Sequence, residues 1–149
     1  MKRKPVLPPT YLWTAVIVMA ALHFLFPVKR IIPFPSDLLG VLPLALGAAL
    51  NIIADKAFRA AKTTVKPFQE SAALITDGVY RISRHPMYLG FVLMLLGLAI
   101  LLGSLTPLWV VPIFAVVMDR VFIVVEERML AEKFGQAWLD YKAEVRRWV

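Results

Sequence analysis

Residues 87–125 read MYLGFVLMLLGLAILLGSLTPLWVVPIFAVVMDRVFIVV and contain two long apolar stretches with one short interruption. A helix needs roughly 20 apolar residues, within a range of about 17–25, to cross the hydrocarbon core of a bilayer. Gly103, Ser104 and Pro107 lie together at the interruption, and glycine and proline are the strongest signals for a break. The stretch therefore predicts two membrane spans, residues 87–103 and 105–125, joined as a helical hairpin.

Two further apolar stretches lie upstream, at residues 11–28 and 38–54. The whole chain is 60% hydrophobic and 18% charged, whereas soluble domains are about 45–50% apolar and about 25% charged. Downstream, residues 126–146 place apolar side chains at steps of three and four, which is typical of an amphipathic helix. We therefore expect an all-α integral membrane protein with four transmembrane helices and an amphipathic tail helix, in a single domain over residues 1–149.

Glycines recur at seven-residue steps in two of the predicted spans, as Gly40 with Gly47 and as Gly90 with Gly97. A step of seven returns to nearly the same face of an α-helix, so each pair forms a strip of small residues. Such strips allow the backbones of membrane helices to approach closely. We expect these two faces to be packing surfaces.

Lysine and arginine are distributed unevenly around the predicted spans. Lys29 and Arg30 lie between the first two spans, and Arg120 lies within the fourth. The other fourteen lie before the first span, between the second and third, or after the fourth: Lys2, Arg3, Lys4, Lys56, Arg59, Lys62, Lys66, Arg81, Arg84, Arg128, Lys133, Lys142, Arg146 and Arg147. Because such residues accumulate on the cytoplasmic side, both termini and the middle loop are predicted to face the cytoplasm, across the cell inner membrane.

The same placement favours a membrane over nucleic acid as the partner of these charges. The basic start and the apolar run after it resemble a signal peptide, but no small-residue cleavage site follows. We expect the first span to be a retained anchor.

Ionisable residues gather at the predicted cytoplasmic ends of the third and fourth spans: Arg84, His85, Asp119, Arg120, Glu126 and Glu127. On a regular α-helix Arg120 and Glu127 share a face, while Asp119 points about 100° away from Arg120. Ionisable groups at membrane depth usually face a bundle interior or a water-filled cavity. We therefore expect one polar cavity lined by both helices; an internal Asp–Arg pair and contacts with lipid phosphates are the alternatives. Neither His23 nor His85 has a metal-ligand partner at a useful spacing, so no metal site is predicted.

Two motifs resemble a known family: LITDGVYRISRHPMYLG at residues 74–90, and EERMLAEKFGQAWLDYKAEVRRW at residues 126–148. Over about residues 70–149 the chain resembles the integral-membrane methyltransferases related to isoprenylcysteine carboxyl methyltransferase and phospholipid N-methyltransferase. The resemblance implies that S-adenosylmethionine is the cofactor and that the last two spans and the tail bind it, through Leu74, Ile75, Tyr80, His85, Pro86, Met87, Tyr88, Glu126 and Glu127. In addition, Arg84 or His85 could hold the carboxylate of the cofactor. The implied reaction is methyl transfer, at the cytoplasmic face, to a membrane-embedded lipid or a lipidated small acceptor with a carboxylate or an amine.

The chain departs from this family at one position. The carboxyl methyltransferases carry an arginine two residues beyond Arg120, where this chain has Phe122. We therefore predict catalytic roles for Arg120, which would orient the acceptor, and for Glu127, which with Glu126 could help an amine lose its proton. An NADPH-dependent membrane reductase of the sterol-reductase type is an alternative because it shares the RHP stretch, but Met87 replaces its asparagine. A non-enzymatic membrane lipid-binding protein is the other alternative.

Overall fold

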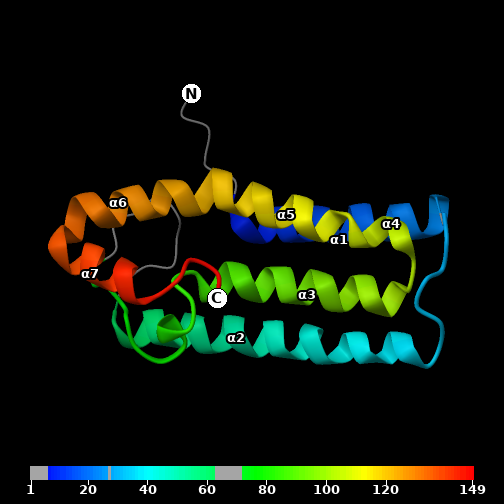
Figure 1. Ribbon diagram of the computed structural model, residues 1–149, viewed down its shortest axis with the longest axis horizontal. Helices are drawn as coiled ribbons and strands as arrows, with labels where there is room; N and C mark the ends of the chain where they lie inside the picture. The colour runs from blue at the N-terminus through cyan, green and yellow to red at the C-terminus, as the bar shows by residue number, and fades with distance from the viewer. Residues whose placement is uncertain (1–6, 27, 63–71) are drawn as a thin grey trace.

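The computed structural model describes residues 7–26, 28–62 and 72–149 (Figure 1). The elements in chain order are α1 (Pro8–Leu25), the 3-10 helix η1 (Ser36–Gly40), α2 (Val41–Ala60), the 3-10 helix η2 (Gly78–Arg81), α3 (Pro86–Leu102), α4 (Leu105–Leu108), α5 (Val110–Met118), the π-helical turn η3 (Asp119–Ile123), α6 (Val124–Phe134) and α7 (Gln136–Glu144). The described residues form no strand, and an isolated bridge joins Arg30 to Ser104. The expected all-α class is confirmed.

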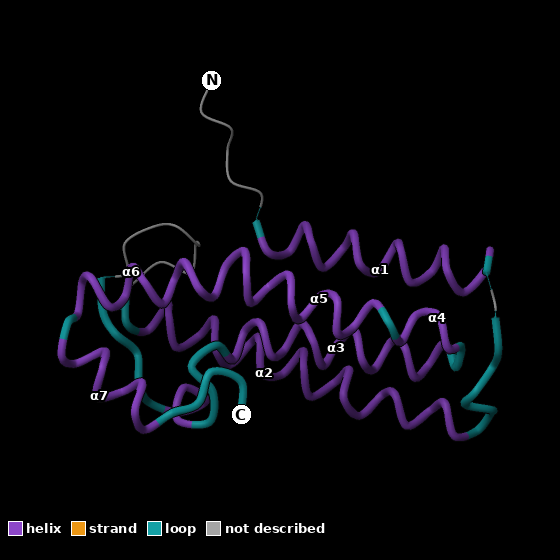
Figure 2. Tube along the Cα trace, turned by 45° about the horizontal axis from the view of Figure 1, so that its top comes forward, coloured by secondary structure: helices purple, strands orange, loops and turns teal. Residues whose placement is uncertain are grey.

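Within the described residues, three helical segments are long and apolar enough to cross a membrane: Pro8–Leu25, Ser36–Ala60 and Leu105–Phe134. The fourth apolar helix, α3, has 17 residues and at 1.5 Å per residue is about 26 Å long. It lies in the middle of the bundle, packs along α2 and also contacts α1 and α5 (Figures 1 and 2). The protein is an integral membrane protein, with three spans by length and α3 as the shorter fourth apolar helix.

The expected hairpin lies between α3 and α4. Gly103 ends α3 with a φ of +69°, and a Cβ there would lie 2.6 Å from the carbonyl oxygen of Ile32, so glycine suits this position. The carbonyl of Gly103 accepts hydrogen bonds from the backbone N–H groups of Ile31 (2.8 Å) and Ile32 (3.1 Å). The loop after α1 therefore closes over the hairpin and holds α3 beside α4 and α5.

The two glycine strips face each other between the antiparallel helices α2 and α3. A Cβ added to Gly47 would lie 2.5 Å from the carbonyl oxygen of Gly90, and one added to Gly97 would lie 2.5 Å from that of Gly40. The backbones are therefore in direct contact at two places. The expectation that these glycines form packing surfaces is confirmed, and the contacts fix the register of α2 on α3.

One irregular turn changes the register of the long helix formed by α5, η3 and α6. At η3 the N–H of Val124 donates to the carbonyl of Asp119, five residues back instead of four. A π turn takes one extra residue, so two turns that include it cover about eight residues, whereas two α turns cover about seven. Asp119 therefore shares a face with Glu127, and Arg147 contacts both. The prediction that Arg120 shares a face with Glu127 is wrong because it assumed a regular α-helix.

Gly135 divides the predicted tail helix 126–146 into two helices. It has a φ of +52°, in the left-handed region that favours glycine, and it ends α6 at Phe134. After it, α7 folds back along α6 (Figures 1 and 2). Trp138 and Tyr141 of α7 are buried and pack in one cluster with Tyr80. The prediction of a single tail helix is therefore wrong, although Trp138, Tyr141 and Val145 of its predicted apolar face are buried.

Candidate functional site

The sequence Arg84-His85-Pro86 forms the start of α3. Pro86 occupies the beginning of the helix, where its missing N–H is tolerated. The backbone N–H of His85 donates to Ser83 Oγ at 3.1 Å. The side chains of Arg84 and His85 are only 7% and 5% exposed. A guanidinium and an imidazole are thus held inside the protein at this end of the bundle.

Glu127 of α6 is the acceptor that compensates these groups. Its Oε1 accepts from Arg84 Nη2 at 2.8 Å and from Arg147 Nε at 3.1 Å, and it lies 3.3 Å from His85 Nε2. Its Oε2 accepts from Arg147 Nη2 at 2.6 Å. Arg147 also donates to Asp119 Oδ1 at 3.0 Å. Both oxygens of Glu127 are therefore already bound by cationic side chains, and the hydrogen bond to Glu127 raises the pKa of Arg147.

The segment from Lys142 to Arg147, which we call the C-terminal clasp, is bound to the start of α3 by its backbone. Arg84 donates through its guanidinium to the carbonyls of Lys142 (3.0 Å) and Val145 (2.9 Å). The backbone N–H of Arg84 donates to the carbonyl of Arg146 at 3.0 Å, and Ser83 Oγ donates to that of Arg147 at 3.1 Å. The clasp and Glu127 together bind most of the N–H donors of Arg84. The role of this side chain is therefore structural.

Glu126 has a different environment from its neighbour. Its Oε1 accepts from the hydroxyl of Tyr88 at 2.6 Å, but its Oε2 lies 3.7 Å from His85 Nδ1, beyond hydrogen-bond distance. Its side chain is 23% exposed, whereas that of Glu127 is 8% exposed. Of the two adjacent glutamates, Glu126 keeps an oxygen available to a ligand.

An apolar cluster with aromatic members adjoins the charged groups. Four of the expected cofactor-binding residues lie in it: Leu74, Ile75, Tyr80 and Met87. Trp138 and Tyr141 of α7 complete its wall, and the hydroxyl of Tyr141 donates to the carbonyl of Tyr80 at 2.7 Å. The hydroxyl of Tyr80 itself is buried and has no hydrogen-bond partner among the described residues. Burial, followed by the charges of Tyr141, Glu126 and Asp55, raises the pKa of Tyr80.

The structure brings together all ten predicted cofactor-binding residues in these two adjoining groups, but it does not bring Arg120 to them. The side chain of Arg120 is 78% exposed, and its Nε lies 3.6 Å from Asp119 Oδ2. The expectation that it shares a cavity with Glu127 is therefore wrong. Phe122 is buried and stacks on Tyr88, with ring centroids 6.1 Å apart.

Sequence reasoning missed Arg147 as a member of the site. It counted this arginine only toward the orientation of the protein, although two buried carboxylates beside a single buried arginine required another cation. Charge balance was the signal that could have found it. Trp138 and Tyr141 were predicted to lie on an apolar face, and they belong to one of the two motifs that resemble the family. Their packing against Tyr80 was not predicted, because it depends on the turn at Gly135.

Comparison with known proteins gives three concordant findings. Residues 36–137 match the family model of phospholipid methyltransferases. The chain is 40% identical over 81 residues to protein-S-isoprenylcysteine O-methyltransferase A of Arabidopsis thaliana, covering 52% of this chain and 40% of that protein. It is 38% identical over 132 residues to the protein-S-isoprenylcysteine O-methyltransferase of Saccharomyces cerevisiae, covering 82% of this chain and 54% of that protein.

The fold is similar to a solved structure of the eukaryotic intramembrane Ras methyltransferase ICMT (isoprenylcysteine carboxyl methyltransferase). The TM-score is 0.62 at 22% sequence identity, over 95% of this chain and 51% of that one. At this identity the likeness concerns the fold. The chain spans about half the length of the relatives it matches.

Proposed function

The chain belongs to the phospholipid methyltransferase family, and we propose on this basis that it transfers a methyl group from S-adenosylmethionine to a lipophilic acceptor in the membrane. The observation that carries the proposal is that two polar groups near the start of α3 can still bind a ligand. Oε2 of Glu126 lies beyond hydrogen-bond distance of His85, and the buried hydroxyl of Tyr80 has no hydrogen-bond partner among the described residues. A buried polar group without a partner is costly, so a ligand that bonds to it is favoured.

The residues present fit this cofactor in charge and polarity. S-adenosylmethionine carries an ammonium, a sulfonium, ribose hydroxyls and an adenine ring. Glu126 offers a carboxylate oxygen to the ammonium or a ribose hydroxyl, and Tyr80 offers its hydroxyl. The neighbours of Tyr80 that offer apolar surface to the ring are Leu74, Ile75 and Met87. Arg84 and Glu127 bind each other and the clasp, so we propose that they position the site rather than contact the cofactor.

When bound, S-adenosylmethionine would supply an electrophilic methyl group to an oxygen or nitrogen of the acceptor, and its sulfur would keep the electron pair of the broken bond and leave as the neutral thioether. The chain contributes alignment of the two reactants and exclusion of water. Tyr88 and His85 are buried beside Glu126, and the hydroxyl of Tyr88 donates to Glu126 and so holds it in place. A carboxylate acceptor needs no base, whereas an amine must first lose its proton. The catalytic roles predicted for Arg120 and Glu127 stay predictions.

We propose that the end of the bundle that carries the site faces the cytoplasm, across the cell inner membrane. Lys56, Arg59, Arg84 and the cations of the tail lie toward this end, and Lys29 and Arg30 follow α1 toward the other. The N-terminal cations and Lys66, which belong to the same argument, lie outside the described residues.

The orientation can be tested with single cysteines because the chain has none of its own. In intact cells, a membrane-impermeant maleimide should label Lys29→Cys directly and should label Lys62→Cys only after permeabilisation. Permeabilised samples of both variants control for the reactivity of each thiol. Labelling of Lys62→Cys in intact cells would reverse the proposed orientation.

Titration of detergent-purified protein tests the cofactor. We expect saturable binding of S-adenosylmethionine and of its demethylated product S-adenosylhomocysteine, measured by calorimetry, and no saturable binding of NADPH. Binding of NADPH alone would instead support a membrane reductase. Binding of neither cofactor would leave a lipid-binding protein as the better description and would contradict the proposed function.

A further inference from the structure

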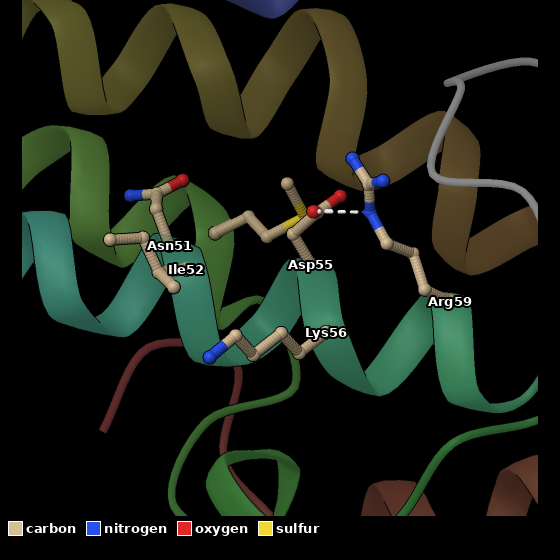
Figure 3. A pocket seen from close by; sticks show the side chains of 6 residues that line it. Asn51, Ile52, Asp55, Lys56 and Arg59 are labelled. Atoms are coloured by element: carbon tan, nitrogen blue, oxygen red, sulfur yellow. Dashed lines mark hydrogen bonds and ion pairs between the residues drawn. The ribbon is translucent and has the colours of Figure 1, made fainter.

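A groove of about 450 Å³ lies on α2, next to the candidate cofactor site (Figure 3). The residues that line it are Asn51, Ile52, Asp55, Lys56, Arg59 and Met87. Asn51, Asp55 and Arg59 recur every four residues and so share one side of α2, and Figure 3 shows the ion pair between the last two. Arg59 Nε lies 2.7 Å from Asp55 Oδ2. No expectation from the sequence assigned a function to this face of the second span.

The groove is continuous with the candidate site in two ways. Met87, the second residue of α3, lines the groove and also packs in the apolar cluster around Tyr80. The part of α2 that carries Asp55 and Arg59 also contacts Tyr80 directly, because the rings of Phe58 and Tyr80 pack edge to face with centroids 5.7 Å apart. A ligand in the groove would therefore lie beside the group that the cofactor is proposed to contact.

The other side of the groove opens on the apolar outer face of α2. Ile52 is 56% exposed and stands one turn before Lys56, which is also exposed. A lysine at the end of a membrane helix can extend its ammonium to the interface while its stem lies on apolar surface. An amphiphile could place its hydrocarbon chain along this outer face with its polar head in the groove. This approach comes from the lipid side.

The charges of the groove favour an anionic head. Lys56 and Arg59 supply two positive charges against the single carboxylate of Asp55. The Asp55 contact uses Nε of Arg59, and the side chain is 79% exposed, so its terminal nitrogens can reach a ligand. By contrast, Arg84 and Arg147 are engaged by Glu127. The cations suited to a ligand near Met87 are therefore those of α2.

We propose that this α2 groove binds the anionic head of the methyl acceptor, a membrane amphiphile whose carboxylate or phosphate is held by Arg59 and Lys56. The inference rests on the proposed function and assigns the acceptor side of the same site. It makes α2 the element that selects the acceptor, while Tyr80 of η2, Met87 of α3 and Glu126 of α6 contact the cofactor.

The test compares Arg59→Gln and Lys56→Gln with the wild-type protein. Two probes represent the two sources of the anion: N-acetyl-S-farnesylcysteine, which carries a carboxylate, and phosphatidylethanolamine in mixed micelles, which carries a phosphate. Direct binding of each probe is measured without turnover, and KM is measured for whichever probe is methylated. Loss of a charge-assisted contact should weaken binding of the recognised probe about tenfold or more. The affinity for S-adenosylmethionine should stay within about twofold, because neither side chain is among the proposed cofactor contacts.

The matched control is Arg81→Gln. Like Arg59, Arg81 forms an exposed ion pair with the aspartate four residues before it, and its Nη2 lies 3.5 Å from Asp77 Oδ1. Unlike Arg59, it lies outside the groove. It should leave the affinity for both probes unchanged. Equal weakening in Arg81→Gln would show a general surface attraction and overturn the proposal, as would unchanged binding in Arg59→Gln or no binding of either probe by the wild type. A fall in the S-adenosylmethionine affinity of Arg59→Gln or Lys56→Gln would assign the groove to the cofactor and overturn the proposal. Titration of the wild-type protein with S-adenosylmethionine separates all these results from failure of the proposed function.

Discussion

Glu127→Gln is expected to lower the free energy of unfolding by about 3–5 kcal/mol, the range typical of breaking a buried ion pair by removing one partner. The side chains of Glu127 and Arg84 are 8% and 7% exposed, so the guanidinium of Arg84 would be left in a desolvated place without its carboxylate. Arg147 would keep Asp119 as its single carboxylate partner. Chemical denaturation in a fixed detergent, followed by the fluorescence of the tryptophans, measures the change.

Two further variants give this prediction its controls. Asp77→Asn removes an exposed partner of Arg81 and should change the free energy of unfolding by no more than about 1 kcal/mol. The double variant Arg84→Gln, Glu127→Gln should cost less than the sum of its single variants, because removing both partners leaves no unpaired charge. Strict additivity, or a loss for Glu127→Gln as small as that for Asp77→Asn, would show that the cluster does not stabilise the end of the bundle.

Features set by local sequence were predictable here. Gly103 with Pro107 predicted the hairpin because glycine suits the left-handed residue that ends α3 and proline is tolerated in the first turn of α4. The glycine pairs predicted two packing faces because small residues let backbones approach closely, and the structure shows that these faces meet each other. In both cases the predictive pattern lies within one or two turns of helix.

Features that depend on departures from regular geometry were not predictable. The π turn at Asp119–Ile123 has no signature in its apolar and charged residues, yet it moves every later side chain of the helix by about one position. That shift is why Asp119, and not Arg120, faces the same way as Glu127. The return of α7 at Gly135 likewise brings Arg147 to Glu127 from 20 residues along the chain, a contact that no spacing rule contains.

The same shift separates the tasks of two adjacent glutamates that look equivalent in sequence. Glu127 is turned to the clasp and to Arg84, so its charge is used within the protein. Glu126 is turned to Tyr88 and His85, with one oxygen beyond hydrogen-bond distance of either. A double glutamate is therefore expected to behave as one structural and one ligand-binding residue.

Glu126→Gln should accordingly weaken binding of S-adenosylmethionine about 10- to 100-fold, the effect of losing one charge-assisted hydrogen bond worth about 1.5–3 kcal/mol. Its amide can still accept from Tyr88, so the free energy of unfolding should fall far less than in Glu127→Gln. The two variants make the same isosteric change at neighbouring positions, and each is the control for the other. Calorimetric titration of both proteins, at a temperature where both are folded, gives the comparison. Unchanged cofactor affinity in Glu126→Gln would remove this residue from the site. Equal losses of affinity in both variants would mean that the cofactor displaces the cations bound to Glu127 and binds both carboxylates.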